Sequence, residues 1–321
     1  MSVDNCEQRS SYVDYRNKYL NAPNLNLTAP VDVSLELSSF CNMGCTYCYH
    51  SDKKQLPFKQ NFMEALTAHR IIFEAAYLGV NSLKFNWRGE ATMNPAFASI
   101  TAYAKRLATG STFIDRITNS NFKFSPDKSE IFEGLANQTK VKVSYDSFRK
   151  EVFEKQRALG DHDVTTKNID RFYNWPGRKT VLVIQAVRTR LNRDEDIAGE
   201  ARKRWPDALI SIRDMVEGRV GKDLSAVKDK ERDYSERQSC IQAHARLIFD
   251  WQGNAVPCCP DIKAELSLGN IQKMSLLDIF NSPKAKALRQ DLLSLKAFES
   301  SPCKDCSSFE TFKGFAPNFD S

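Results

Sequence analysis

Short apolar segments alternate with amphipathic segments along the first two thirds of the chain. Residues 31–37 alternate apolar and polar positions as a strand does, and apolar residues recur at helical spacing over 62–78. The same succession predicts further strands and helices, with Ser125 capping one helix and Pro126 at its first position. The strands are expected at 82–87, 113–118, 141–145, 181–187 and 209–212, and the helices from about 94 and at 127–135, 149–159, 164–175 and 194–205.

Six strands with helices between them predict an α/β fold of parallel βα units, either an open sheet or a partial (β/α)6 TIM-like barrel. In such folds the reactive site lies at the carboxyl ends of the strands. Changes in composition along the chain predict four parts: a polar N-terminal extension at 1–30, the barrel at 31–217, a charged linker at 218–235, and a small cysteine-rich domain at 236–321.

Composition narrows the class of protein. The chain has 321 residues, 41% hydrophobic and 27% charged, which is ordinary for a globular protein. It has no apolar run of membrane-spanning length, and its N-terminus lacks a secretory apolar region, so we expect a cytoplasmic protein without a membrane partner. The net charge of +6 is scattered, which argues against a nucleic-acid partner but allows one anionic substrate group.

Cysteines supply the first chemical signal. Eight of the nine fall into two sets, and clustered cysteines in a reducing compartment are more often metal ligands than disulfides. The first set, Cys41, Cys45 and Cys48, directly follows the first strand. Three thiolates suit an iron–sulfur cluster whose fourth iron stays open. A zinc site with His50 as a fourth ligand is the alternative.

The second set lies near the C-terminus. Gly253 permits a tight hairpin that returns Cys258 to Cys240, and Cys303 and Cys306 form a further pair, so the four thiols can make one site. The spacing from Gly253 favours Cys258 over Cys259. By itself this pattern fits zinc as well as iron.

The CxxxCxxC loop, with Tyr47 before its last cysteine, resembles the radical S-adenosylmethionine superfamily, and the resemblance covers residues 31 to about 215. Gly89–Glu90 looks like the family's Gly-Glu motif, which receives the amino group of the cofactor's methionine part. The chain has Arg88 and Ala91 where many members have Gly and Pro. Further positions resemble cofactor-contacting positions of the family: Asn119, Ser144, Asp146 and Val187 at the strand ends, and Arg157 in the stretch that follows the fourth strand.

The C-terminal part resembles the SPASM extension, in its shorter twitch form. That resemblance implies an auxiliary 4Fe–4S cluster fully ligated by Cys240, Cys258, Cys303 and Cys306. The implied cofactors are therefore two 4Fe–4S clusters and S-adenosylmethionine. A reducing partner such as flavodoxin or ferredoxin is implied as well.

The resemblance implies an oxidoreductase or transferase of natural-product or cofactor biosynthesis. It would cleave S-adenosylmethionine reductively to a 5′-deoxyadenosyl radical, which abstracts hydrogen from the substrate. Thirty residues are short for a leader-peptide domain, which favours a small sugar, aminocyclitol or nucleotide, phosphorylated ones included, and dehydrogenation with the auxiliary cluster as electron acceptor. The alternatives are sulfur donation by that cluster, thioether or carbon–carbon crosslinking of a peptide, and a non-enzymatic zinc-stabilised binding protein.

Two roles remain to be filled in that reaction. Basic residues near the predicted barrel mouth, Arg88, Arg188, Arg190 and Arg213, include candidates for holding a substrate phosphate, and Arg213 at the end of the sixth strand is favoured. Oxidation of an alcohol also needs a base for the hydroxyl proton, for which Tyr145 and Asp146 are candidates.

Overall fold

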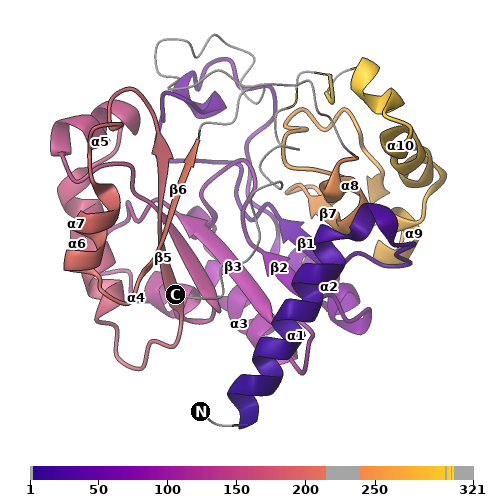
Figure 1. The fold of residues 1–321 in the computed structure, drawn as a ribbon, viewed down its shortest axis with the longest axis horizontal. Helices are drawn as coiled ribbons and strands as arrows, with labels where there is room; N and C mark the ends of the chain where they lie inside the picture. Colours follow the sequence, from indigo (N-terminus) through magenta and orange to yellow (C-terminus); the bar gives the residue numbers. More distant parts are fainter. Residues whose placement is uncertain (1–2, 215–238, 301, 305, 307–321) are drawn as a thin grey trace.

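A single curved sheet organises the molecule. The computed structural model describes residues 3–214, 239–300, 302–304 and 306, so the predicted linker at 218–235 lies outside the described residues. Nine strands are hydrogen-bonded in the order β6-β5-β4-β3-β2-β1-β7-β8-β9, and the first six run parallel (Figure 1). They are β1 (Asp32–Leu35), β2 (Ser82–Lys84), β3 (Asp115–Ser120), β4 (Lys140–Ser144), β5 (Val181–Arg188) and β6 (Leu209–Asp214).

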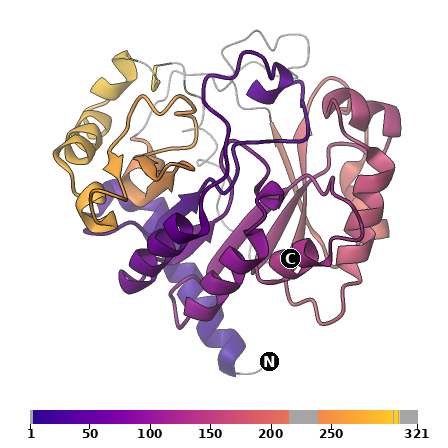
Figure 2. The same ribbon diagram turned by 180° about the vertical axis from the view of Figure 1, so that it is seen from behind.

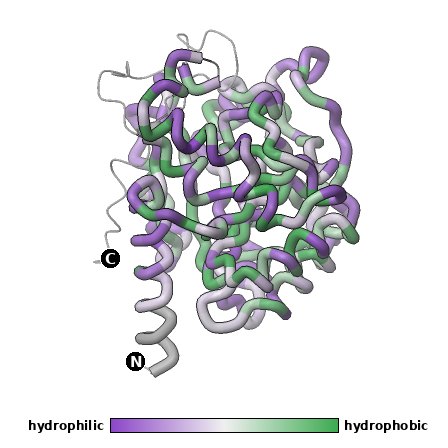
Figure 3. The backbone as a smooth tube through the Cα atoms, turned by 90° about the vertical axis from the view of Figure 1, so that its right-hand side faces the viewer, coloured by the Kyte–Doolittle hydropathy of each residue, from purple (hydrophilic) through white to green (hydrophobic). Residues whose placement is uncertain are grey.

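Helices cover the outer face of these strands, as Figure 2 shows from behind. They are α2 (Ala65–Tyr77), α3 (Phe97–Leu107), α4 (Ser129–Ala136), α5 (Lys150–Gln156), α6 (His162–Tyr173) and α7 (Ile197–Arg204). Alternate strand residues, such as Val33 and Leu35, are fully buried against them. In Figure 3, the hydrophobic stretches of the backbone accordingly gather in the interior of the molecule. The predicted parallel α/β partial barrel is confirmed.

One predicted helix cap is wrong. The helix expected from 127 begins at Ser129, with Lys128 as its N-cap residue. Ser125 does not cap it, because its hydroxyl is hydrogen-bonded to the carboxylate of Asp127.

The predicted N-terminal extension consists largely of one long helix. Helix α1 (Val3–Leu20) carries Tyr12, Tyr15 and Tyr19 on one face, and the last two are almost fully buried. The Tyr15 hydroxyl lies 3.5 Å from Asp32 on β1, and the Lys140 ammonium on β4 donates to the Tyr12 hydroxyl at 3.2 Å. Helix α1 therefore covers the inner face of the barrel at the amino ends of the strands (Figure 1).

The C-terminal part continues the same sheet. Strand β7 (Arg246–Phe249) pairs parallel with β1, and β8 (Asn254–Val256) and β9 (Gly269–Asn270) follow antiparallel. Gly253, with φ of +82°, turns the chain between β7 and β8, which confirms the predicted hairpin. Three helices complete this part: α8 (Ile241–Ala245), α9 (Leu276–Phe280) and α10 (Pro283–Leu293). None of the helices in the described ranges is long and apolar enough to cross a membrane.

Candidate cofactor and cluster sites

The loop of the first cysteine set stands at the carboxyl end of β1. The Gly44 amide donates to the Ala158 carbonyl at 2.7 Å and the Thr46 amide to that of Gln156 at 2.9 Å, so the end of α5 holds the loop. A turn in which the Cys48 amide donates to the Cys45 carbonyl brings these two residues close together. The chain thus presents all three predicted thiols from one short, well-anchored loop.

Burial sets the chemistry of these thiols. It raises the pKa of Cys41 to about 12, with the Glu90 carboxylate adding to the rise. It also raises the pKa of Cys45, against the opposing charge of Arg157, whose Nη1 lies 3.6 Å from the Cys45 sulfur. The metal-free loop therefore carries thiols, and iron binding would displace their protons.

The donor set fits an iron–sulfur cluster better than zinc. His50, the alternative fourth ligand, is buried with its Nε2 only 2.8 Å from the Arg88 carbonyl. In the described part of the chain, no three cysteine, histidine or carboxylate side chains are already closed on a common point. Binding of a cluster would therefore draw the thiols of this loop together.

Gly89 and Glu90 are packed directly on the segment that leads into Cys41. A Cβ atom on Gly89 would lie 2.3 Å from the Ser38 carbonyl oxygen and 2.4 Å from that of Phe40, so only glycine fits. The Glu90 amide donates to the Phe40 carbonyl at 2.8 Å. This contact places the Glu90 carboxylate beside Cys41, as the resemblance to the Gly-Glu motif requires.

The Glu90 carboxylate is buried but well supplied with donors. It accepts hydrogen bonds from the Thr92 hydroxyl at 2.7 Å and the Asn121 amide at 2.8 Å, and burial still raises its pKa. A cationic group bound there would supply the positive counter-charge that the neutral donors around this buried carboxylate do not provide.

Three predicted residues meet around the carboxylate of a fourth, Asp146. It accepts from Arg157 Nη2 at 3.0 Å, from the Val187 amide at 2.8 Å and from the Tyr47 hydroxyl. Asp146 is fully buried, and its own carbonyl is bound by Asn192. Asp146 therefore positions Arg157 and Tyr47 beside Cys45, and its engagement by three donors speaks against a role as the base.

The structure does not bring Tyr145 to the site, so its candidacy as the base is corrected. Successive strand residues point to opposite faces, and Ser144 and Asp146 take the inner one. The Tyr145 hydroxyl is instead 2.8 Å from both His162 Nε2 and Thr166 Oγ1 in the helical layer. Its ring is fully buried.

The remaining strand-end candidates lie on the inner face of the barrel. Strand register pairs Asn119 with Lys142, Ser144 with Gln185, and Val187 with Arg213. Arg213 Nε donates to the Ser211 hydroxyl at 3.1 Å, so its side chain turns back along β6.

Two of the other three arginines are structural. Arg88 makes a buried, bidentate ion pair with Glu36 at 2.6 and 2.7 Å and donates to the Ile262 carbonyl at 3.1 Å. Arg188 donates to the carbonyls of Asn192 and Glu195 in the loop after β5. The third, Arg190, is exposed on the same loop. Of the four arginines, Arg213 alone is on the inner face of a barrel strand in the described part of the chain.

The four predicted auxiliary ligands line one small cavity. Its walls are Cys240, Cys258, Cys303, Cys306, Gln242, Pro260, Phe298 and Pro302. Burial raises the pKa of Cys240 to about 12, and the nearby Cys306 and Cys303 contribute to the rise. Cys259 does not line the cavity. Its carbonyl accepts a hydrogen bond from the Trp87 indole at 3.0 Å. Its thiol contributes to raising the pKa of Tyr19 and of Arg246, so it lies near these two side chains.

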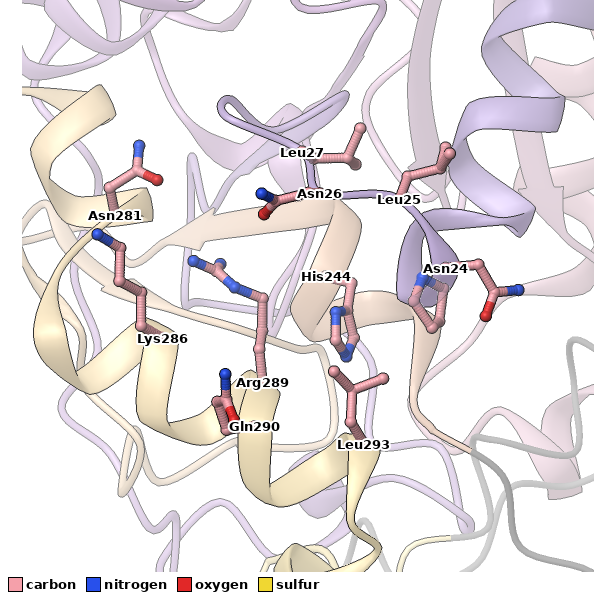
Figure 4. A pocket seen from close by; sticks show the side chains of 11 residues that line it. Asn24, Leu25, Asn26, Leu27, His244, Asn281, Lys286, Arg289, Gln290 and Leu293 are labelled. Carbon is pink, nitrogen blue, oxygen red and sulfur yellow. The ribbon is translucent and has the colours of Figure 1, made fainter.

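A second cavity, which the sequence did not predict, lies on the other side of α8. It is lined by residues 23–27, by Asn281 and by α10 residues including Lys286 and Arg289 (Figure 4). His244 of α8 also faces it, and burial next to Arg289 lowers the pKa of His244 to about 4, so its imidazole is neutral near pH 7. Segments more than two hundred residues apart in the sequence form this cavity, which is why no sequence motif predicts it.

Comparison with known proteins agrees with this geometry. Residues 240–307 match the SPASM family, described as an iron–sulfur cluster-binding domain. No curated protein sequence matches the chain.

Solved structures share the fold at low sequence identity. BtrN in complex with AdoMet and 2-DOIA is 16% identical, with a TM-score of 0.56 over 86% of this chain and 92% of that chain. SuiB of Streptococcus suis bound to S-adenosylmethionine is 15% identical, with a TM-score of 0.65 over 88% and 72%. The protein anSMEcpe with bound AdoMet is 17% identical, with a TM-score of 0.60 over 88% of each chain.

The chain therefore shares the overall fold of these S-adenosylmethionine-bound structures, and its residues 240–307 match the SPASM family. The SPASM match supports the expected iron–sulfur cluster in the C-terminal part.

Proposed function

We propose that this protein is a radical S-adenosylmethionine dehydrogenase that acts on a small, anionic substrate. The observation that carries the proposal is the occurrence, on one continuous sheet, of an anchored three-cysteine loop and a separate cavity lined by four cysteines. Three ligands leave one iron open for a cofactor, whereas four close the cluster and suit it to electron transfer.

Residues around the first loop are arranged to hold S-adenosylmethionine. Glu90 would receive its ammonium group, and Arg157, fixed by Asp146, would receive its carboxylate. The amide of Asn119 and the hydroxyl of Ser144 lie on the inner face of the barrel and are suited to hydrogen-bond the polar atoms of S-adenosylmethionine. When bound, the first cluster and this cofactor supply the 5′-deoxyadenosyl radical that abstracts a hydrogen atom from the substrate.

The auxiliary site would accept the electron that remains on the substrate. Oxidation of an alcohol to a ketone removes one hydrogen atom, one proton and one electron. The hydrogen atom would go to the radical and the proton to a base or water, while Cys240, Cys258, Cys303 and Cys306 would hold the cluster that accepts the electron. A reductant of the flavodoxin or ferredoxin type would supply the separate electron that cleaves the cofactor.

Peptide modification is the second candidate function. SuiB has also been solved with its precursor peptide SuiA, and that structure covers 94% of this chain at a TM-score of 0.65. The BtrN structure, by contrast, contains 2-DOIA in addition to AdoMet. A product lighter by two hydrogen atoms from a small alcohol supports dehydrogenation, and the same loss from a peptide supports crosslinking. Replacement of oxygen by sulfur would instead identify the auxiliary cluster as a sulfur donor.

The first experiment measures iron and labile sulfide per chain after anaerobic reconstitution, beside a variant with Cys41, Cys45 and Cys48 all changed to Ala. Two four-iron clusters predict ~8 iron atoms in the parent and ~4 in the variant. With dithionite and S-adenosylmethionine, only the parent should release 5′-deoxyadenosine. Four iron atoms or fewer in the parent, with zinc in the C-terminal part, would remove the auxiliary cluster from the mechanism.

A further inference from the structure

The inner face of the barrel carries more positive than negative charge. Strand register places Lys84, Lys140, Lys142, Arg213 and Arg246 on this face, together with the carboxylates of Asp32 and Asp115. Both carboxylates are already engaged. Asp32 accepts from Lys84 at 2.5 Å and from Arg246 at 2.7 Å, and Asp115 accepts from Lys140 at 3.2 Å.

Lys142 takes part in none of these ion pairs. It is partly buried in the middle of β4, and among the described residues it makes no hydrogen bond and no ion pair. Its strand neighbours Val141 and Val143 are fully buried on the helical side, so Lys142 faces the interior of the barrel. Within the described part of the chain, this ammonium group therefore has no direct ion-pair partner of the kind that buried cations normally have.

Polar side chains stand one step above Lys142 on the same face. Strand register aligns Ser144, Gln185 and Ser211 in a row across β4, β5 and β6. Arg213 lies above this row and donates to Ser211, so its side chain turns toward the row from the far side. Adjacent strands are about 4.8 Å apart, so the row spans about 10 Å, a length over which its polar side chains could contact one tetrahedral or planar anion.

The electrostatics agree with this arrangement. Burial lowers the pKa of Lys142 to about 7, and among the charged groups Arg213 adds most to this effect, followed by Lys84. Asp115 opposes the shift and Lys140 reinforces it. The charge of Arg213 thus disfavours the charged form of Lys142, and an anion bound between the two side chains would favour it.

We propose that Lys142 and Arg213, with Gln185 and Ser211 between them, form a subsite for an anionic group of the substrate, such as a phosphate or carboxylate. The inference rests on the proposed function in naming the substrate as the occupant. It adds Lys142, which no motif marks, as the residue that selects an anion.

Sulfate is a suitable probe because its charge does not change between pH 6 and 9. Equilibrium binding of sulfate to the reconstituted protein, without reductant, should weaken about 10-fold or more in Lys142→Met, since a charge-assisted hydrogen bond contributes about 1.5–3 kcal/mol. Lys167→Met removes an exposed lysine of α6 and should leave sulfate affinity unchanged.

The pH profile separates this role from a structural one. Sulfate should bind the protonated amine, so its affinity should be level below about pH 7 and fall by up to about tenfold per pH unit above it. Lys142→Arg, whose guanidinium stays charged, should bind sulfate without that fall. Competitive acylation of Lys142, read by peptide mass spectrometry, should show its pKa rising when sulfate is added.

Two results would overturn the proposal. The first is sulfate binding that is equally tight and equally pH-dependent in the parent and in Lys142→Met, which would mean an adventitious ion only. The second is a loss of S-adenosylmethionine affinity in Lys142→Met with sulfate binding intact, which would assign the lysine to the cofactor. Neither readout requires turnover, so failure of the proposed dehydrogenation would be recognised separately from the iron count and 5′-deoxyadenosine release.

Discussion

At the scale of single residues, the structure separates side chains that reach the site from neighbours that do not. Ser144, Tyr145 and Asp146 are consecutive, yet the middle residue points into the helical layer and the outer two point inward. The sequence marked the end of this strand as chemically important, but it did not decide which of the adjacent side chains face the cofactor. Strand alternation decides this once the register with β5 is known.

Gly89 offers a test at this scale. Gly89→Ala should destabilise the cluster-free protein by about 1–3 kcal/mol, because the new methyl group would overlap the backbone oxygens of Ser38 and Phe40. Urea unfolding measures the change. Gly44→Ala is the matched control, since its Cβ would meet no atom closer than 3.5 Å, and it should unfold at nearly the parent midpoint. Equal stability of the two variants would show that the loop before Cys41 relaxes freely.

At the scale of elements, the β7–β8 hairpin and helix α8 assemble the auxiliary site. Cys240 is the N-cap residue of α8 and Cys258 follows β8, so the parallel pairing of β7 with β1 fixes where both stand. The tandem cysteines at 258 and 259 differ in their surroundings: Cys258 lines the cavity, and Cys259 lies near Tyr19 of α1 and Arg246 of β7.

This division predicts different outcomes for two neighbouring substitutions. Cys258→Ala should lower the iron content from ~8 to ~4 atoms per chain and leave S-adenosylmethionine cleavage in place, because only the auxiliary cluster loses a ligand. Cys259→Ala should keep ~8 iron atoms. Iron analysis after reconstitution checks both. The reverse pattern would exchange the two cysteines in the ligand set.

At the scale of the whole molecule, buried polar contacts join the barrel to the SPASM domain. Arg88 reaches from the end of β2 to the Ile262 carbonyl while paired with Glu36, and the Trp87 indole donates to the Cys259 carbonyl. Arg246 of β7 is paired with Asp32 of β1. These contacts hold the two cysteine sites in a fixed relation, as the proposed electron transfer between substrate and auxiliary cluster would require.

Arg88→Met tests how much these contacts matter. It should lower the free energy of unfolding by about 3–5 kcal/mol, because the Glu36 carboxylate would stay buried without its partner. Arg70→Met removes one half of a solvent-exposed helical pair with Glu74 and should change it by less than about 1 kcal/mol. Denaturant unfolding of both variants gives the comparison. A small effect at Arg88 would mean that Glu36 becomes protonated or hydrated instead.

The sequence by itself determined the six barrel strands, the helices between them, the hairpin at Gly253 and the two cysteine sets, because hydrophobic periodicity, turn glycines and ligand spacing are local properties. It could not determine that α1 covers the inside of the barrel, that β7 extends the barrel sheet, or that Arg88 is a structural residue. Nor could it show that Lys142 faces the interior without a hydrogen bond or ion pair to any other residue that the structure describes. Those facts depend on which faces and segments meet in space, and only the tertiary structure decides that.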